Sequence, residues 1–315
     1  MKKILAMIII SCVMLVMTGC TANDYKKAEE LYSSGNLEAA KEIYESLGDY
    51  EDSTQKLMAC RYGLAAKQLE DGNYKEALNE FEALGDYEDS KDKISECKIA
   101  SANDAIDQGN YESALFELEK ISGTDGSEEL INKCKYNIAA EKYENGDVTG
   151  ALVLYAEITG YEDSKRIIAD EMMKYAGKDF VELVTEGQNR YNSYMKTAAR
   201  ELLNLSYGSG GTWSPDSNNP DIVAMLKAKR DIVEMKNNYK NVFTKQVMDA
   251  CNDKEIKEMN DAYLELAKTA EKTYNTQTLY GAIVNAVNGT YDNTLDKLSS
   301  DVDDYTLAYN ALMGK

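Results

Sequence analysis

Apolar residues recur along most of this chain at intervals of three and four, the spacing that places them on one side of a helix. One such segment covers residues 53–71, and a shorter one covers residues 74–84. Gly72 and Asn73 separate the two segments, and glycine tolerates the left-handed backbone that often follows a helix end. The pattern therefore predicts two helices joined by a tight turn.

This predicted hairpin repeats with a period of 37 residues, as the spacing of its serines, glycines and alanines shows (Ser53, Ser90, Ser127 and Ser164; Gly35, Gly72, Gly109 and Gly146; Ala40, Ala77, Ala114 and Ala151). Two further positions are predicted to be core in every repeat, one large and one small (Tyr44, Phe81, Leu118 and Tyr155; Ala28, Ala65, Ala102 and Ala139). A fixed period of this length predicts a solenoid, in which each unit buries its apolar side against its neighbours.

The run Gly-Asn-Tyr-x-x-Ala-x-x-x-Phe-x-x-Leu at residues 72–84 resembles the tetratricopeptide repeat family, and the likeness covers about residues 22–176. Two departures are that the period exceeds the family's value of about 34 residues and that the usual proline after the second helix is missing. The resemblance implies about four and a half helical hairpins whose first helices line a groove for an extended peptide or a partner's helix.

The N-terminus has the pattern of a processing signal. Two lysines precede an apolar run at residues 4–16, which is shorter than the ~20 residues that a spanning helix needs, and Met17-Thr18-Gly19-Cys20 follows. These residues resemble the lipobox of bacterial lipoproteins, although Met17 replaces the usual leucine. The resemblance implies cleavage before Cys20, lipidation of that cysteine and a location on the extracytoplasmic face of the cell membrane.

Beyond Gly177 the 37-residue register ends and longer amphipathic segments begin. We expect helices over 178–206, over 220–251 with Asn219 as its N-cap, around 256–270 with Asn252 or Asp253 as its N-cap, and over 280–312 with a kink at Gly289. Four such helices predict an antiparallel bundle. The expected organisation is therefore a signal peptide (1–19), a repeat solenoid (20–176) and an all-α bundle (177–315).

Acidic residues dominate the surface that these helices would present. From residue 20 onwards the chain has 33 basic and 55 acidic residues, and residues 20–175 alone carry a net charge of −18. Such a surface repels nucleic acid and anionic headgroups, so attachment to the membrane must come from the lipid. It favours a partner protein or peptide with a basic segment.

Neither the cysteines nor the acidic turns predict a metal site. Cys60, Cys97 and Cys134 share one repeat position and are expected to be buried free thiols. The Gly-Asp-Tyr-Glu-Asp-Ser turns at 48–53 and 85–90 offer carboxylates that suit calcium, but they lack the EF-hand spacing. We interpret them as helix caps, with the tyrosine packing the turn against the hairpin.

The chain contains no histidine, which removes the commonest general base and most catalytic zinc sites. We therefore expect neither an enzyme nor a cofactor, and we expect an adaptor whose groove presents Gln68, Asp104 and Lys142. Trp213, in the glycine-rich segment 207–219, is either a contact residue or a cover for one end of the bundle. The alternative function is a small-ligand sensor or solute receptor, with a pocket lined by tyrosines of the C-terminal half (Tyr191, Tyr194, Tyr239, Tyr263, Tyr280, Tyr305 and Tyr309).

Overall fold

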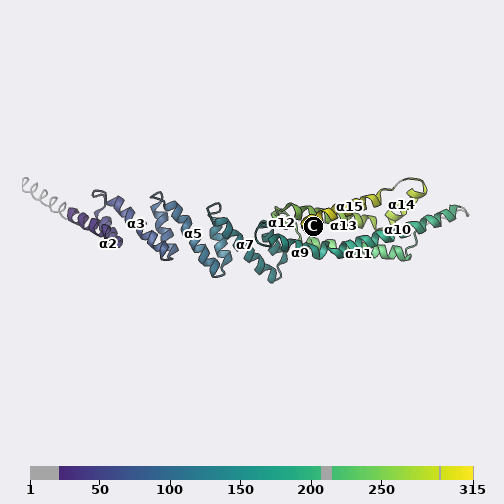
Figure 1. Ribbon diagram of the computed structural model, residues 1–315, viewed down its shortest axis with the longest axis horizontal. Coiled ribbons are helices and arrows are strands. Elements are labelled where there is room, and N and C mark those ends of the chain that lie inside the picture. Colours follow the sequence, from purple (N-terminus) through teal and green to yellow (C-terminus); the bar gives the residue numbers. More distant parts are fainter. Residues whose placement is uncertain (1–20, 207–214, 291, 315) are drawn as a thin grey trace, which may run out of the picture. The chain divides into compact units, whose positions relative to one another are not determined.

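The computed structural model describes residues 21–206, 215–290 and 292–314, and every regular element in those ranges is a helix (Figure 1). The all-α prediction is therefore confirmed. The chain divides into two units between Cys134 and Lys135, inside one helix, and the predicted domain boundary at 176/177 lies within the second unit. The predictions for residues 1–20 and for Trp213 fall outside the described residues.

The first unit consists of helices paired in sequence order. The first repeat comprises helical residues 21–33 and α2 (Leu37–Leu47), the second α3 (Ser53–Glu70) and α4 (Tyr74–Leu84), and the third α5 (Ser90–Asp107) and α6 (Tyr111–Glu119). The second repeat matches the prediction to within one residue. Gly72 has a φ of +80°, which is the left-handed conformation that the turn between α3 and α4 requires. The fourth repeat begins with α7 (Ser127–Glu144), where the first unit ends.

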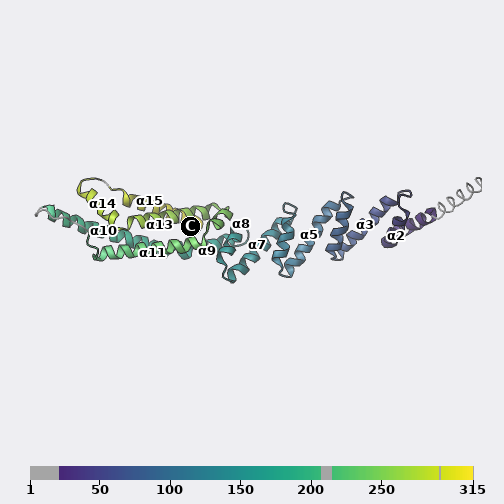
Figure 2. The same ribbon diagram turned by 180° about the vertical axis from the view of Figure 1, so that it is seen from behind.

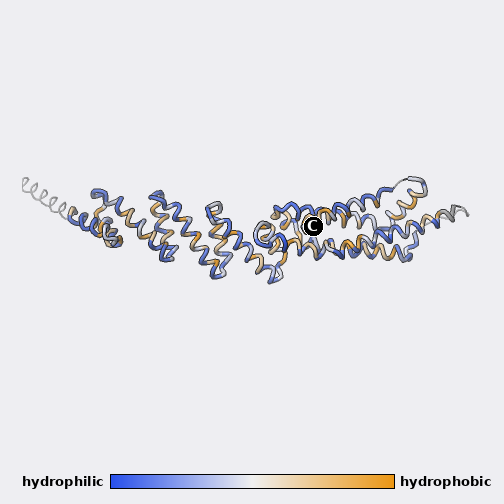
Figure 3. Tube along the Cα trace, viewed as in Figure 1, coloured by the Kyte–Doolittle hydropathy of each residue, from blue (hydrophilic) through white to orange (hydrophobic). Residues whose placement is uncertain are grey.

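The core of the first unit is a row of small clusters, each shared by one hairpin and the first helix of the next. The cluster around Phe81 joins α3 and α4 to Cys97 on α5. Ala65 on α3 and Ala77 on α4 are completely buried, which lets the two helices approach closely. Apolar and polar residues alternate along these helices accordingly (Figure 3). Each hairpin thus completes its core with the helix that follows.

The second unit, from Lys135 onwards, contains one large core. Its elements after α7 are α8 (Val148–Glu157), α9 (Ser164–Ala176), α10 (Lys178–Ser206), α11 (Pro220–Val242), α12 (Lys245–Ala250), α13 (Lys254–Thr273), α14 (Thr276–Val287) and α15 (Thr294–Leu312). α10 packs along α11, and α13 packs along α15 (Figures 1 and 2). Gly187 on α10 permits the close approach of the Tyr274 ring, because an atom of that ring lies 2.4 Å from where a Cβ would stand.

Two predicted helices of the C-terminal half are interrupted, so those predictions were wrong. The helix expected over 220–251 ends at Val242, and α12 starts anew after Thr244, whose side chain accepts a hydrogen bond from the Val247 amide. The helix expected over 280–312 is split into α14 and α15 around Gly289, which has a φ of +69°. The predicted caps Asn219 and Asp253 are confirmed, and they accept from the amides of Asp221 and Ile256.

The prediction that the acidic turns cap the repeat helices through side-chain hydrogen bonds was also wrong. Asp52 occupies the N-cap position of α3, but its side chain makes no capping hydrogen bond. Ser53 is fully buried, and its hydroxyl has no hydrogen-bond partner in the described part of the chain, while the equivalent Ser90 donates to the carbonyl of Tyr87 at 2.5 Å. The serine therefore serves as a small residue in close packing. The aspartate carboxylate, which does not cap its own helix, can accept a hydrogen bond from another part of the chain.

Candidate functional site

The residues predicted to face a partner do not form one site. Gln68 on α3 is half-buried, and its Oε1 has no hydrogen-bond partner among the described residues. Asp104 on α5 is exposed, and Lys142 pairs with Asp147 at 3.3 Å. Neither Gln68 nor Asp104 lines the groove described below. Cys20 and Trp213, the two remaining candidates, lie outside the described residues.

A tyrosine–aspartate hydrogen bond recurs at one position of three repeats. The tyrosine comes from the first helix of a hairpin, and the aspartate precedes the first helix of the next hairpin. The pairs are Tyr25 with Asp52, Tyr62 with Asp89, and Tyr136 with Asp163 at 2.7 Å. The N-cap aspartates thus bind a neighbouring hairpin instead of capping their own helix. We call this contact the tyrosine–aspartate tie.

The ring of each tie tyrosine packs against two other aromatic side chains, one from the second helix of its hairpin and one from the turn that follows. The Tyr62 ring lies 5.6 Å from the Phe81 ring of α4 and 6.0 Å from the Tyr87 ring in the following turn. Tyr25 and Tyr136 make the corresponding contacts in their repeats. The predicted role of the turn tyrosine, to pack the turn against the hairpin, is confirmed at these turns.

The third repeat lacks every part of this arrangement. The tie tyrosine is replaced by Ile99, the second-helix aromatic by Leu118, the turn tyrosine by Thr124 and the aspartate by Gly126. The backbone of the turn differs as well. Glu51, Glu88 and Glu162 have φ values of +47° to +48° in the three tied turns, whereas Gly126 has a φ of +80° in the third.

The tie raises the pKa of its tyrosines and, in the third of the three ties, lowers the pKa of the aspartate. Donation to Asp52 raises the pKa of Tyr25 to about 12, and donation to Asp163 raises the pKa of Tyr136 to about 12. The hydrogen bond from Tyr136, followed by the nearby Arg166, holds the pKa of the Asp163 carboxyl below its usual range. The neutral phenol and the ionised carboxylate are therefore the stable pair at neutral pH.

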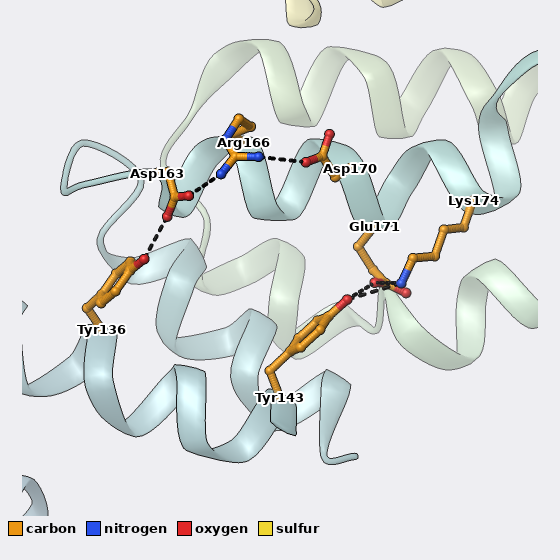
Figure 4. A network of polar contacts seen from close by, with 7 residues as sticks. All are labelled: Tyr136, Tyr143, Asp163, Arg166, Asp170, Glu171 and Lys174. Atoms are coloured by element: carbon orange, nitrogen blue, oxygen red, sulfur yellow. Dashed lines mark hydrogen bonds and ion pairs between the residues drawn. The ribbon is translucent and has the colours of Figure 1, made fainter. Parts of the chain in front are cut away.

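In the second unit the tie belongs to a wider polar network on α7 and α9 (Figure 4). Arg166 pairs with Asp163 and also with Asp170, at 3.2 Å. Further along α9, the almost fully buried Glu171 accepts a hydrogen bond from Tyr143 at 2.6 Å and pairs with Lys174. These contacts satisfy the buried Glu171 carboxylate and link α7 to α9.

A groove of about 560 Å³ lies in the first unit beside the second tie. Its walls include three partly exposed tyrosines, an apolar side chain and two exposed carboxylates (Tyr32, Tyr62 and Tyr87; Leu37; Glu88 and Asp89). Lys56 places its Nζ 5.0 Å from the centre of the Tyr32 ring and 3.0 Å from Glu29. A cation is thus already held at this groove by an aromatic face together with a carboxylate.

Sequence reasoning missed this groove because it sought exposed side chains on the first helices alone. The groove combines the first helices of two repeats with the acidic turn, which was interpreted as a cap. A tyrosine in the first helix of a hairpin, together with Gly-Asp-Tyr-Glu-Asp in the turn after that hairpin, was a signal visible in the sequence.

Cys60, Cys97 and Cys134 are buried free thiols, as expected, and Cys251 is a fourth. Burial raises the pKa of Cys97 and of Cys134 to about 11, which suppresses the reactive thiolate. In the described part of the chain, no group of three or more potential ligands is placed to hold a metal ion.

The tyrosines proposed as a ligand pocket are mostly core residues. The ring centres of Tyr239 and Tyr263 lie 4.6 Å apart, and the ring centre of Phe180 lies 4.7 Å from that of Tyr263. Tyr191, Tyr194 and Tyr305 are also buried, whereas Tyr280 is 45% exposed. The interpretation of these rings as core is confirmed for the five buried ones.

Within the described ranges, no helix combines the length and apolar character needed to cross a bilayer. Comparison of the chain with protein-family models, with curated proteins and with solved structures finds no match. The geometry of the residues is therefore the basis for assigning a function.

Proposed function

We propose that this protein is a lipid-anchored adaptor on the extracytoplasmic face of the cell membrane, which binds a basic segment of a partner protein. In this proposal the repeats form a tetratricopeptide-like solenoid, the C-terminal helices form an antiparallel bundle, and no reaction is catalysed. Cys20 carries the lipid. The groove beside Tyr62, with its three rings and two carboxylates, is the observation that carries the proposal.

The packing of the first unit supports a solenoid. Every apolar cluster there joins one hairpin to the first helix of the next, as in the cluster of Ala28, Ala40, Tyr44 and Cys60. A unit built in this way has a series of small cores in place of one large core, and it offers an extended surface to a partner. The Lys2-to-Cys20 pattern supports the anchor.

The chemistry of the groove favours lysine or arginine in the partner. Tyrosine faces attract cations, and Glu88 and Asp89 add negative charge at the same wall. Lys56 over Tyr32 is an intramolecular example of that contact. The acidic first unit would also speed the approach of a basic segment, at a rate that falls with added salt.

Site-specific photo-crosslinking in intact cells tests this proposal. A photoreactive residue at Ala59, inside the groove, should capture a partner, and the same residue at the exposed Ser113 on α6 should not. Glu88→Gln should weaken the capture several-fold. Glu51→Gln is the matched control, because Glu51 has the same repeat position and the same φ but lies outside the groove. Equal capture by the two variants would contradict the proposal.

The anchor is tested separately. Cys20→Ser should leave the precursor uncleaved and abolish labelling by a fatty-acid analogue in cells. Labelling of the variant at the wild-type level would contradict lipidation at Cys20.

A further inference from the structure

Two small residues on α3 give the groove beside Tyr62 its room. Ala59 and Gly63 lie one turn apart and line the groove together. A Cβ on Gly63 would stand 2.6 Å from Cδ1 of Leu37, so glycine allows the Leu37 side chain to approach α3 this closely. In each of the other repeats at least one of the two positions holds a larger residue (Ala22 and Lys26; Glu96 and Ala100; Lys133 and Asn137). The small pair is therefore particular to the second repeat.

Two aromatic rings of this groove are held at a fixed angle to each other. The centres of the Tyr62 and Tyr87 rings lie 6.0 Å apart, and their planes meet at 58°. Both side chains are partly exposed, and the partly exposed Tyr32 of the preceding repeat lines the same groove. A cation that enters the groove therefore meets aromatic surface from two successive repeats.

The carboxylates of the groove are next to these rings and are open to a partner. The tie fixes Asp89 beside the phenol of Tyr62, which donates to Oδ1 and leaves Oδ2 without a donor from the described residues. Glu88 is exposed and forms no ion pair with a described basic side chain. Lys93, one turn into α5, is already paired with Glu96 at 2.7 Å. Two carboxylates thus remain for donors that a ligand brings.

Arginine matches this arrangement better than lysine does. Its guanidinium is planar, so it can lie on a tyrosine ring while its N–H groups donate to carboxylates at the edge of that ring. Lysine carries a compact and strongly hydrated ammonium, which concentrates its contacts at one point. Lys56 shows that simpler contact in this chain, because its Nζ lies 5.0 Å from the centre of the Tyr32 ring and pairs with one carboxylate, Glu29.

We propose, on the basis of the proposed function, that the groove beside Tyr62 binds an arginine side chain of the partner in preference to a lysine. The guanidinium stacks on the tyrosine rings and donates to Asp89 Oδ2 and to the Glu88 carboxylate. The methylene groups of the arginine lie along Ala59 and Leu37, where the small residues leave room for them.

Three short peptides that differ at one residue test this preference. The peptides are acetyl-Gly-Ser-Xaa-Ser-Gly-amide, in which Xaa is arginine, lysine or citrulline. Each is titrated into the protein produced without residues 1–19, and NMR follows the ring signals of the tyrosines. We expect saturable shifts with the arginine peptide and an affinity about twofold to fivefold weaker with the lysine peptide. The citrulline peptide keeps the shape of arginine without its charge and should not bind measurably.

A pair of matched variants shows whether the rings make the contact. Tyr87→Leu should weaken binding of the arginine peptide about twofold to fivefold, because it removes one ring from the groove. Tyr50→Leu is the control, since Tyr50 has the same repeat position and packs on Tyr25 as Tyr87 packs on Tyr62, but lies outside the groove. It should leave the affinity unchanged.

Equal affinity for the arginine and lysine peptides would overturn the preference, and it would leave the broader proposal of a basic segment standing. Three further results would also overturn it: binding of the citrulline peptide as tightly as the arginine peptide, equal losses for Tyr87→Leu and Tyr50→Leu, or no saturable binding of any peptide. Photo-crosslinking at Ala59 in cells decides separately whether a partner occupies the groove.

Discussion

The second and third repeats share a length, a glycine turn and a buried alanine contact. They differ in the side chains that contact the following hairpin. In the second repeat, Tyr62 packs between two rings and donates to Asp89. In the third repeat the corresponding residues are Ile99 and Gly126, which cannot form this hydrogen bond, and an apolar cluster joins α5 and α6 to Ile131 and Cys134 of α7. The repeat pattern therefore fixes the helices, and a separate set of residues fixes each junction.

This difference indicates that the parts of the tie form a unit. An aspartate without its tyrosine would lose the donor, and a tyrosine without the turn aromatic would lose half of its ring contacts. The third repeat has replaced all of them together, and its left-handed residue is Gly126, one position after the glutamate that has this conformation in the tied turns. The groove that we assign to a partner lies at the tied junction.

The largest expected effect comes from the aromatic in the core of the second repeat. Phe81→Ala should destabilise the first unit by about 3–5 kcal/mol, because it removes a fully buried ring and leaves a cavity. Urea denaturation followed by circular dichroism measures this loss. Leu118→Ala, at the same position of the untied third repeat, should cost less. An equal or larger loss for Leu118→Ala would contradict the view that the aromatic cluster strengthens the tied junction.

A transplant tests whether the tie is sufficient. Replacing residues 122–126 with Gly-Asp-Tyr-Glu-Asp, together with Ile99→Tyr, should stabilise the third junction by about 1 kcal/mol through one added hydrogen bond and one ring contact, since Leu118 offers no ring. The same turn without Ile99→Tyr is the control, and it should bring no gain. Hydrogen exchange at the start of α7 measures the effect. Equal protection in the two variants would show that the tie does not stabilise the junction.

Removing only the tie hydroxyl gives an effect of about the same size. Tyr62→Phe keeps both ring contacts and should cost about 1 kcal/mol, since the lost hydrogen bond is partly exposed to water. Faster hydrogen exchange at the start of α5, with unchanged exchange at the start of α7, is the expected signature. Uniform destabilisation of the whole unit would contradict a local role.

Sequence reasoning succeeded where one period governs the structure. The bounds of α3 and α4 and the buried position of Phe81 followed from spacing alone. It failed at Thr244 and Gly289, because apolar periodicity continued across breaks set by local turn chemistry. The partner groove was not predicted, because it depends on which residues of successive repeats lie side by side. A buried oxygen without a hydrogen-bond partner among the described residues, such as Asp301 Oδ2, can be recognised only in three dimensions.

The tie also predicts a modest pH dependence. The pKa of Tyr136 is raised to about 12 in the folded chain, above the ordinary value of about 10. The stability that its hydrogen bond contributes is therefore complete below about pH 10 and is lost as the pH rises towards 12. The pKa of Asp163 is lowered in the folded chain, so the stability that its ionised carboxylate contributes is lost at acid pH, as the pH falls below about 4. Tyr136→Phe should reduce the alkaline dependence, as measured by thermal unfolding across pH, and an unchanged profile would contradict this prediction.

The central claim is that a basic partner segment lies in the groove of the first unit. Hydrogen–deuterium exchange of the protein with the partner captured at Ala59 measures this most directly. We predict slower exchange in α3 and in the turn at residues 85–89, and this protection should be reduced by Glu88→Gln but not by Glu51→Gln. Protection confined to residues 135–315 would contradict the claim and would place partner binding in the second unit.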